Sequence, residues 1–440
     1  MSKRTKRETA FTSRRRFMKN TAAAAVGAGL AANVQVARSA HVAGSETLRI
    51  GLVGCGGRGR GAAVQALKAD PDTQLVALAD AFGDQIERSL ELFARESDVA
   101  SRVAVPPDRR YVGFDAYRQL IDGDVDVVLL AAPPHFRPDH LQACVQAGKH
   151  VFAEKPIAVD ARGVKRVLAS CEAAQKKNLA VVSGLCWRYE NRARASMEQV
   201  HNGAIGQIVA MHSLYNASRP GKEWPMRREA EWGDMEWQLR NWYWFTWLSG
   251  DHIVEQAVHS IDKAAWAVHD EPPQSAVSLG GLQARTGPEL GTIFDHHAVV
   301  YEFASGLKHF HSCRQQPSCA NEVATHIIGT QGVCEVEKGR IRDHDGSTTW
   351  KFGGQRNVMH QQEQDELFAS IRSGRPINNG VFMSRSTMLA ILGRMASYTG
   401  QKITWERAMD SQEDLSPPSY DWNVRLEVPP IAMPGVSQFV

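Results

Sequence analysis

Short apolar runs alternate with amphipathic segments along the chain between residues 47 and 157. The apolar runs predict buried strands of the parallel type at 48–53, 73–80, 102–105, 125–131 and 151–153. The segments between them have helical spacing of apolar residues and predict helices at 60–68, 84–96, 114–121 and 138–147. This alternation favours an α/β fold with a parallel sheet, which we assign to a first domain at 46–157.

The pattern changes after residue 158. A helix (164–176), a strand (180–184) and a second helix (192–201) lead into long β-rich segments. These predict strands at 208–214, 274–282, 296–303, 308–314, 325–329 and 333–337, followed by helices at 358–373 and 384–399. We therefore expect an α/β domain at 158–410 with a large, open, mostly antiparallel sheet, and an extended Pro-rich arm at 411–440.

The first forty residues differ from the rest in charge. They hold nine of the 51 Lys and Arg residues and one of the 48 acidic residues, which leaves the remaining chain with a net charge of −5. With 43% hydrophobic and 22% charged residues the chain has the composition of an ordinary globular protein. A body without a basic surplus has no electrostatic signature for nucleic acid.

Residues 13–19, SRRRFMK, resemble a twin-arginine export motif and precede an apolar stretch at 22–32. A charged segment, an apolar segment and a small-residue exit in this order indicate a signal peptide, which we place at 1–43; an amphipathic helix is the alternative. The expected location is periplasmic or extracellular, with the twin-arginine export machinery as a partner. Among the seven cysteines, which include no C-x-x-C, only Cys313 and Cys319 are close enough in sequence to suggest a disulfide, and burial as small apolar residues is the main expectation.

A glycine-rich turn follows the first predicted strand. Gly54, Gly56, Gly57 and Gly59, with Arg58 between them, fit the G-x-G-x-x-G pattern, and Asp80 ends the next strand. In a dinucleotide site the glycines make a tight turn and admit the pyrophosphate at a helix N-terminus, and the acid binds ribose hydroxyls. Asp80 favours NAD because it would repel a 2′-phosphate, while Arg58 leaves NADP possible. A methyl-transfer cofactor fold and a plain glycine turn are the alternatives.

Further along the chain, Glu154-Lys155-Pro156 is preceded by AGKHVF at 147–152. Together with APPHFR at 132–137, GAIG at 203–206, GTQG at 329–332 and the segment 250–262, these residues resemble the Gfo/Idh/MocA family of oxidoreductases. The resemblance implies a Rossmann domain, a second α/β domain whose sheet often mediates homo-oligomers, and cofactor contacts from Pro133, His135, Glu154 and Lys155. Three positions, Ala132, Pro134 and Arg137, depart from the Thr-Pro-Asn-x-x-His that the family often has, and His135 and His140 have a capping or core role as the alternative.

Residues 250–262 have a helical pattern that places Glu255, His259 and Asp262 on one face. The resemblance implies that His259 is the acid/base, and Glu255 stands where the family has Asp. In alcohol oxidation the histidine takes the hydroxyl proton, Lys155 stabilises the developing alkoxide and Glu255 supports both. A metal held by His252, Glu255 and His259 is a weaker alternative, and we assign no metal.

Six of the eleven tryptophans lie within 224–247: Trp224, Trp232, Trp237, Trp242, Trp244 and Trp247. They indicate either a surface for sugar rings or a satellite core. We assign Trp242, Arg188, Tyr189 and Asp262 to the substrate site.

The sequence thus predicts an exported NAD(P)-dependent oxidoreductase with a tightly bound cofactor, which acts on a sugar, glycoside or cyclic polyol. The alternatives are a redox-neutral, NAD-dependent glycoside hydrolase that uses transient oxidation, and a non-catalytic cofactor-binding protein.

Overall fold

The computed structural model describes residues 47–218, 226–285 and 291–440. The signal peptide predicted at 1–43 and Trp224 lie outside these residues. Within them, no helix has both the length and the apolar character needed to cross a membrane.

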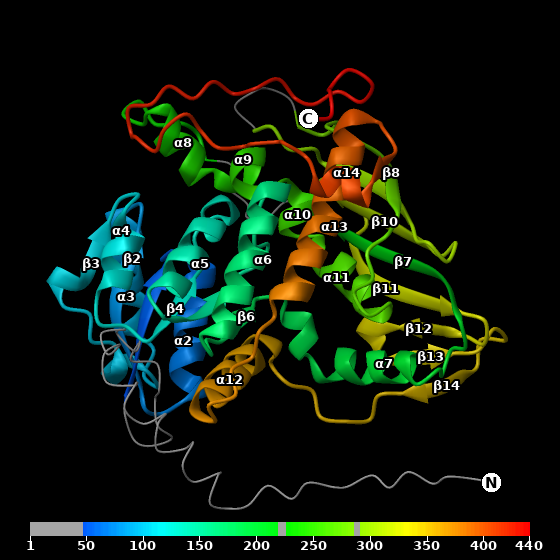
Figure 1. Cartoon of the computed structure of the whole chain (residues 1–440), viewed down its shortest axis with the longest axis horizontal. Helices are drawn as coiled ribbons and strands as arrows, with labels where there is room; N and C mark the ends of the chain where they lie inside the picture. Colours follow the sequence, from blue (N-terminus) through cyan, green and yellow to red (C-terminus); the bar gives the residue numbers. More distant parts are fainter. Residues whose placement is uncertain (1–46, 219–225, 286–290) are drawn as a thin grey trace, which may run out of the picture. The chain divides into compact units, whose positions relative to one another are not determined.

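A six-stranded parallel sheet forms the first domain (Figure 1). Its strand order is β3-β2-β1-β4-β5-β6, the doubly wound order of a Rossmann fold. The strands are β1 (Leu48–Val53), β2 (Thr73–Asp80), β3 (Arg110–Val112), β4 (Val127–Leu130), β5 (His150–Ala153) and β6 (Val181–Ser183). The helices are α2 (Gly57–Ala69), α3 (Gly83–Phe93), α4 (Ala116–Asp122), α5 (Arg137–Gln146) and α6 (Ala161–Lys176). The last strand, β6, lies beyond the boundary that we drew at residue 157.

The strand expected at 102–105 is wrong. Val103 makes only an isolated bridge to Leu75, and the third strand of the sheet is β3, further along the chain. Pro106 and Pro107 follow the apolar run directly, and because proline has no N–H it cannot extend a ladder there.

The second domain is built on a nine-stranded sheet in the order β14-β13-β12-β11-β7-β10-β9-β8-β15. All neighbouring strands are antiparallel except β7 and β10, so the expectation of a mostly antiparallel sheet is confirmed. The strands are β7 (Ile208–Ala217), β8 (Ser275–Gly281), β9 (His296–Glu302), β10 (Lys308–Gln315), β11 (Glu322–Gly329), β12 (Val333–Glu335), β13 (Arg340–Arg342), β14 (Thr348–Lys351) and β15 (Ile403–Thr404).

Two long helices connect the sheets. The 20-residue α13 (Gly380–Thr399) is buried along most of its length because it packs against β8 and β9 on one side and α6 on the other. Helix α12 (Met359–Arg372) returns to the first domain and packs against α2. The remaining helices are α7 (Asn191–His201), α8 (Asp234–Arg240), α9 (Thr246–Ser249), α10 (His252–Glu255), α11 (Val258–Ala267) and α14 (Trp405–Met409).

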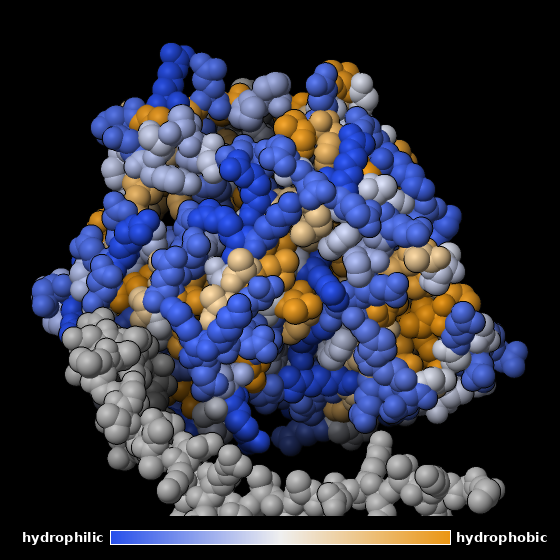
Figure 2. All heavy atoms as spheres, viewed as in Figure 1, coloured by the Kyte–Doolittle hydropathy of each residue, from blue (hydrophilic) through white to orange (hydrophobic). Residues whose placement is uncertain are grey.

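The surface shown in Figure 2 is mostly hydrophilic, with apolar residues gathered on the right over the strands of the second sheet. The outer positions of this sheet include Phe310 on β10 and Leu279 on β8, whose exposed fractions are 43% and 77%. The seven cysteines are all free thiols; six are buried, and the suggested Cys313–Cys319 disulfide is absent.

Ionisable side chains also lie inside the core. On β10, His309 and His311 are buried and both contact the Ser213 hydroxyl, at 2.7 Å each. Burial lowers the pKa of His309 to about 3 from an ordinary 6.5. The pKa of His140 is lowered to about 3 and that of His135 to about 4, mainly by burial as well.

These histidines predict a loss of stability in mild acid. The unfolded chain takes up protons below pH 6.5 and the folded chain does not, so stability that is present above pH 6.5 falls towards the folded pKa values. For each of these histidines, the free energy of unfolding of the protein should fall by about 2 kcal/mol between pH 7 and pH 5. Glu363 has the opposite effect, because its pKa is raised to about 7 and the folded protein therefore binds a proton at this one group before the unfolded chain does. We expect His309→Gln to lose about 2 kcal/mol less than the wild type between these pH values in urea unfolding; an equal loss in both proteins would contradict the assignment.

Candidate functional site

The glycine turn after β1 has the geometry of a phosphate cradle. Gly54 has φ +96°, and a Cβ there would lie 2.3 Å from the Ala132 nitrogen. A Cβ on Gly59 would lie 1.9 Å from the Gly54 oxygen, because helix α2 packs directly onto the turn. Above Gly56, by contrast, the space is open, and no side chain caps the start of α2. The N-terminus of this 13-residue helix is therefore available to an anionic group.

Asp80 stands at the carboxyl end of β2, next to this turn. Its carboxylate accepts hydrogen bonds from the backbone nitrogens of Cys55 (2.6 Å) and Phe82 (2.9 Å). Burial raises the pKa of Asp80, although these two hydrogen bonds oppose the shift. The two bonds hold the carboxylate in place at the edge of the cavity.

A cavity of about 380 Å³ opens over the cradle. The predicted cofactor residues that line it are Gly54, Gly56, Gly57, Arg58, Gly59, Asp80 and Pro133. Trp242, which we assigned to substrate, lines the same cavity, as do Phe82, Phe114 and Arg240. The residues present thus fit a dinucleotide, with an open glycine cradle for phosphates and an acid for ribose hydroxyls.

Lys155 follows β5 and reaches into the second domain. Its Nζ donates to Glu255 Oε1 at 2.8 Å and also to the backbone oxygen of Glu255, so the two side chains form a pair across the domain boundary. His259 is half-buried nearby, and its Nδ1 is a buried atom with no hydrogen-bond partner among the described residues. Burial, reinforced by the charge of Lys155, holds the pKa of His259 well below its usual value, so the ring is neutral at pH 7.

The expectation that residues 250–262 form one helix is wrong. Helix α10 ends at Glu255 and α11 begins at Val258. In a continuous helix the Glu255 carbonyl would accept from the His259 N–H, but it accepts from Lys155 instead, and His259 N bonds to Gln256 O at 3.3 Å. Glu255 and His259 therefore reach the site from two short helices.

A second charged group connects the cradle to this pair. Arg58 donates to Glu154 and, at 2.7 Å, to Glu363 on α12. Burial raises the pKa of Glu154, but the charges of Arg58 and Lys155 outweigh it and hold the pKa below its usual value. Glu154 also accepts from the backbone nitrogen of Lys155 at 3.0 Å, so it positions the lysine. No motif marks Glu363 in the sequence, and its partnership with Arg58 spans 305 residues.

The segment 132–140 departs from the family pattern, and the structure gives its residues other partners. Arg137 is buried and donates to the backbone oxygens of Ala132 and Pro156, so it fastens this loop to the residue after Lys155. His140 lines the cavity and stacks on Tyr117. His135 does not line the cavity; its Nε2 contacts the Tyr420 hydroxyl at 2.7 Å.

Three of the residues assigned to substrate are buried and bonded to other side chains of the protein. Arg188 pairs with Asp262 at 2.8 Å and with Asp270, and it packs over the Phe382 ring. Tyr189 is buried and donates its hydroxyl to Asn379 Oδ1 at 2.7 Å. These contacts join η4 (Cys186–Tyr189) to α11 and α13, which is a structural role. Their contact with substrate stays a prediction.

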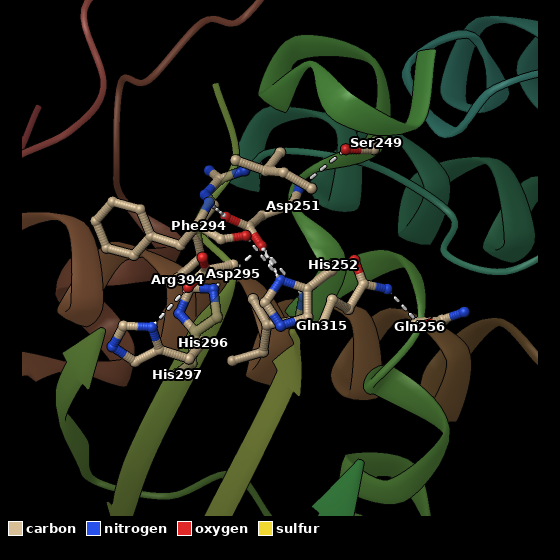
Figure 3. A network of polar contacts seen from close by, with 12 residues as sticks. Ser249, Asp251, His252, Gln256, Phe294, Asp295, His296, His297, Gln315 and Arg394 are labelled. Atoms are coloured by element: carbon tan, nitrogen blue, oxygen red, sulfur yellow. Dashed lines mark hydrogen bonds and ion pairs between the residues drawn. The ribbon is translucent and has the colours of Figure 1, made fainter. Parts of the chain in front are cut away.

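Asp251 organises the start of α10 (Figure 3). It has φ +86°, is fully buried, and accepts from the Tyr398 hydroxyl (2.6 Å) and the Phe294 backbone nitrogen (2.9 Å). Nitrogens of His252 and His297 lie 2.9 and 3.1 Å from its Oδ1. Asp251, His252 and His297 are close enough to be considered as metal ligands. However, the carboxylate already accepts from at least three donors, so we describe the cluster as a hydrogen-bond network that fixes α10 and hence Glu255.

The cradle, the acid at the end of β2 and the Lys155–Glu255 pair define a dinucleotide-dependent oxidoreductase. Residues 48–183 match the model of the Gfo/Idh/MocA oxidoreductase family with an NAD-binding Rossmann fold, and residues 193–335 match the model of the family's C-terminal domain. The chain belongs to the Gfo/Idh/MocA family.

Individual relatives are distant. Inositol 2-dehydrogenase of Salmonella paratyphi B is 25% identical over 343 residues, which are 75% of this chain and 88% of the relative. The 2,7-anhydro-N-acetylneuraminate hydratase of Escherichia coli is 25% identical over 248 residues, or 55% of this chain and 59% of the relative. The crystal structure of myo-inositol 2-dehydrogenase from Lactobacillus plantarum has the same fold, with a TM-score of 0.62 and 18% identity over 82% of this chain and 99% of that one.

Proposed function

We propose that this protein oxidises a secondary alcohol of a sugar, glycoside or cyclic polyol, with NAD as a tightly held cofactor. The observation that carries this proposal is the Lys155–Glu255 pair beside a buried, unpartnered His259 nitrogen, at the end of a sheet that carries a dinucleotide cradle. The family resemblance and the relative described as inositol 2-dehydrogenase support the substrate class.

Lys155, His259 and Glu255 have different roles in the removal of the substrate's hydroxyl proton. Lys155 directs a charged donor at the oxygen and stabilises the alkoxide as the proton leaves. His259 is neutral because burial lowers its pKa, so its imidazole ring can accept that proton. Glu255 holds the lysine Nζ at 2.8 Å and keeps it oriented. The bound NAD supplies the hydride acceptor.

Asp80 supports NAD over NADP. Its carboxylate lines the cavity at the place where the adenosine ribose of a Rossmann cofactor lies. A 2′-phosphate there would face a buried negative charge, although Arg58, which lines the same cavity, reduces the difference.

A redox-neutral reaction is the second candidate. One relative is described as a hydratase, which makes no net change in oxidation state. The same proton-handling residues serve transient oxidation followed by elimination, so a glycoside hydrolase that recycles its NAD uses the same site.

We also propose that the protein is exported and forms homo-oligomers. Residues 13–19 and the apolar stretch after them support twin-arginine export, which carries folded proteins and would carry the cofactor with them. The exposed apolar residues on the outer face of the nine-stranded sheet support self-association through that face.

The catalytic assignment predicts distinct effects for substitutions at the site. His259→Asn should lower kcat by about 100- to 10,000-fold, because it removes the base, and should leave NAD binding intact. Lys155→Met should have a comparable effect on kcat. The measurement is NADH formation, and sugar release from aryl glycosides, across a panel that includes myo-inositol. His326→Asn, on the outer face of the sheet, is the matched control, and normal turnover by His259→Asn would refute the assignment of the base.

The export proposal is tested by the position of the mature N-terminus. Expressed in a bacterium with a twin-arginine pathway, the protein should appear in the periplasm cleaved between residues 37 and 43. Replacing Arg14, Arg15 and Arg16 by lysine should leave it uncleaved in the cytoplasm. A cleaved periplasmic product from that variant would contradict export by this route.

A further inference from the structure

The cavity over the cradle has a roof that the second domain supplies. Met226, Leu239, Arg240 and Trp242, here called the roof, line the cavity together with Asp80 and three phenylalanines of the first domain, Phe82, Phe114 and Phe136. Arg240 lies 4.0 Å from the Phe82 ring centroid and pairs with Asp84 at 3.1 Å. The roof therefore closes over the ends of β2 and β3, which is the adenosine side of a Rossmann site.

The arm, residues 411–440, lies across this contact. The Trp422 ring packs on Phe114 and Phe82, with centroids at 4.6 and 5.4 Å. The Tyr420 ring lies 5.9 Å from Phe114 and 5.7 Å from Phe136, and its hydroxyl contacts His135. The phenylalanines that face the cavity are thus backed from outside by two aromatic rings of the arm.

The arm is also bonded to α8, the helix that carries the roof residues Leu239 and Arg240. The Leu426 nitrogen donates to Asp234 Oδ2 at 3.0 Å, and Gln238 Nε2 donates to the Leu426 oxygen at 3.1 Å. Both partners belong to α8, as does Arg240. The arm therefore contacts the first domain through Tyr420 and Trp422, and it is bonded through Leu426 to the helix that carries Arg240 of the roof.

Both ends of the arm are attached to the same part of the second domain. At its start, Glu413 pairs with Arg394, a fully buried residue of α13. At its end, the Gly435 nitrogen donates to Thr399 O of α13 at 2.9 Å. Within the arm, the Ser411 hydroxyl donates to Val440 O at 2.6 Å and so joins the two ends. Figure 1 shows the resulting loop, which leaves α14, reaches α8 and returns.

We propose that the arm is a strap that retains the cofactor: it fastens the roof to the first domain over the adenosine of NAD and so limits the rate at which the dinucleotide leaves. A dinucleotide under this roof departs only when α8 separates from the ends of β2 and β3. That separation breaks the Trp422 and Tyr420 contacts, because the arm is bonded to both sides. The strap acts on the dissociation rate, which is where most differences in affinity arise. This inference rests on the proposed cofactor site and extends it to a set of residues outside the Rossmann motif.

The test is the release of NADH from the full-length protein. Each protein is loaded with NADH, mixed with excess NAD+, and followed by the loss of bound-nicotinamide fluorescence. Trp422→Ala should accelerate release roughly tenfold or more, because it removes two ring contacts. Tyr420→Phe removes one hydroxyl and should accelerate it roughly fivefold. Met433→Ala, on the exposed part of the same arm, should release NADH at the wild-type rate.

The outcomes separate this inference from the cofactor proposal. Wild-type protein that does not bind NADH overturns the cofactor site, and the strap with it. Wild-type protein that binds NADH and releases it no more slowly than the Trp422→Ala and Tyr420→Phe proteins overturns the strap alone. If Trp422→Ala does not fold, the release rate of Tyr420→Phe decides whether the strap slows NADH release, since this substitution removes a single oxygen atom. Faster release from the Met433→Ala protein, to the same extent, would also overturn it.

Discussion

The Lys155–Glu255 ion pair is the contact on which the arrangement of the site depends. The lysine leaves the end of β5 in the parallel sheet, and the glutamate ends α10 in the second domain. Because Lys155 also binds the Glu255 backbone oxygen, it takes the acceptor that would have continued the helix to His259. One side chain thus joins the domains and breaks the helix. It leaves His259 on a separate helix, with a buried ring nitrogen that has no partner in the part of the chain that the structure describes.

Both members of the pair are held by networks that reach deep into the protein. Behind the lysine, Glu154 binds its backbone nitrogen and is itself held by Arg58, which extends to Glu363 on α12. Behind the glutamate, the buried Asp251 ties the start of α10 to β9 through His297, and to α13 through Tyr398. Arg58 thus gives Glu154 and Glu363 a charged partner, and hydrogen bonds hold the Asp251 carboxylate, because a charge without partners in a medium of low polarity is destabilising. The neutral state of His259 follows from the same environment.

Most of the fold could be predicted from the sequence because its signals are local. Buried strands appear as apolar runs, and the glycine turn with Asp80 marks the cofactor site within a stretch of about thirty residues. The errors came from tertiary contacts. Proline at 106–107 moved the third strand, and Lys155 interrupted a segment with a clean helical pattern. No local pattern could have paired Arg58 with Glu363, or Arg188 with Asp262.

The contacts of the aromatic residues could not be predicted from local sequence patterns either. The tryptophan-rich segment indicated either a sugar surface or a satellite core, and Trp242 proved to line the dinucleotide cavity. Its neighbours Trp237 and Trp247 pack in a cluster that includes Trp422 and Leu426 of the arm. A Pro-rich tail gave no reason to expect those contacts, because they are formed by residues nearly 200 positions apart.

The central claim is that a single NAD molecule spans the cavity and the Lys155–Glu255 pair. A crystal structure of the protein with NAD+ tests this most directly. We expect adenosine ribose hydroxyls within hydrogen-bond distance of Asp80, pyrophosphate at Gly56, and the nicotinamide beside Lys155. A cavity that stays empty at saturating NAD+, or a nicotinamide bound away from Lys155, would contradict it.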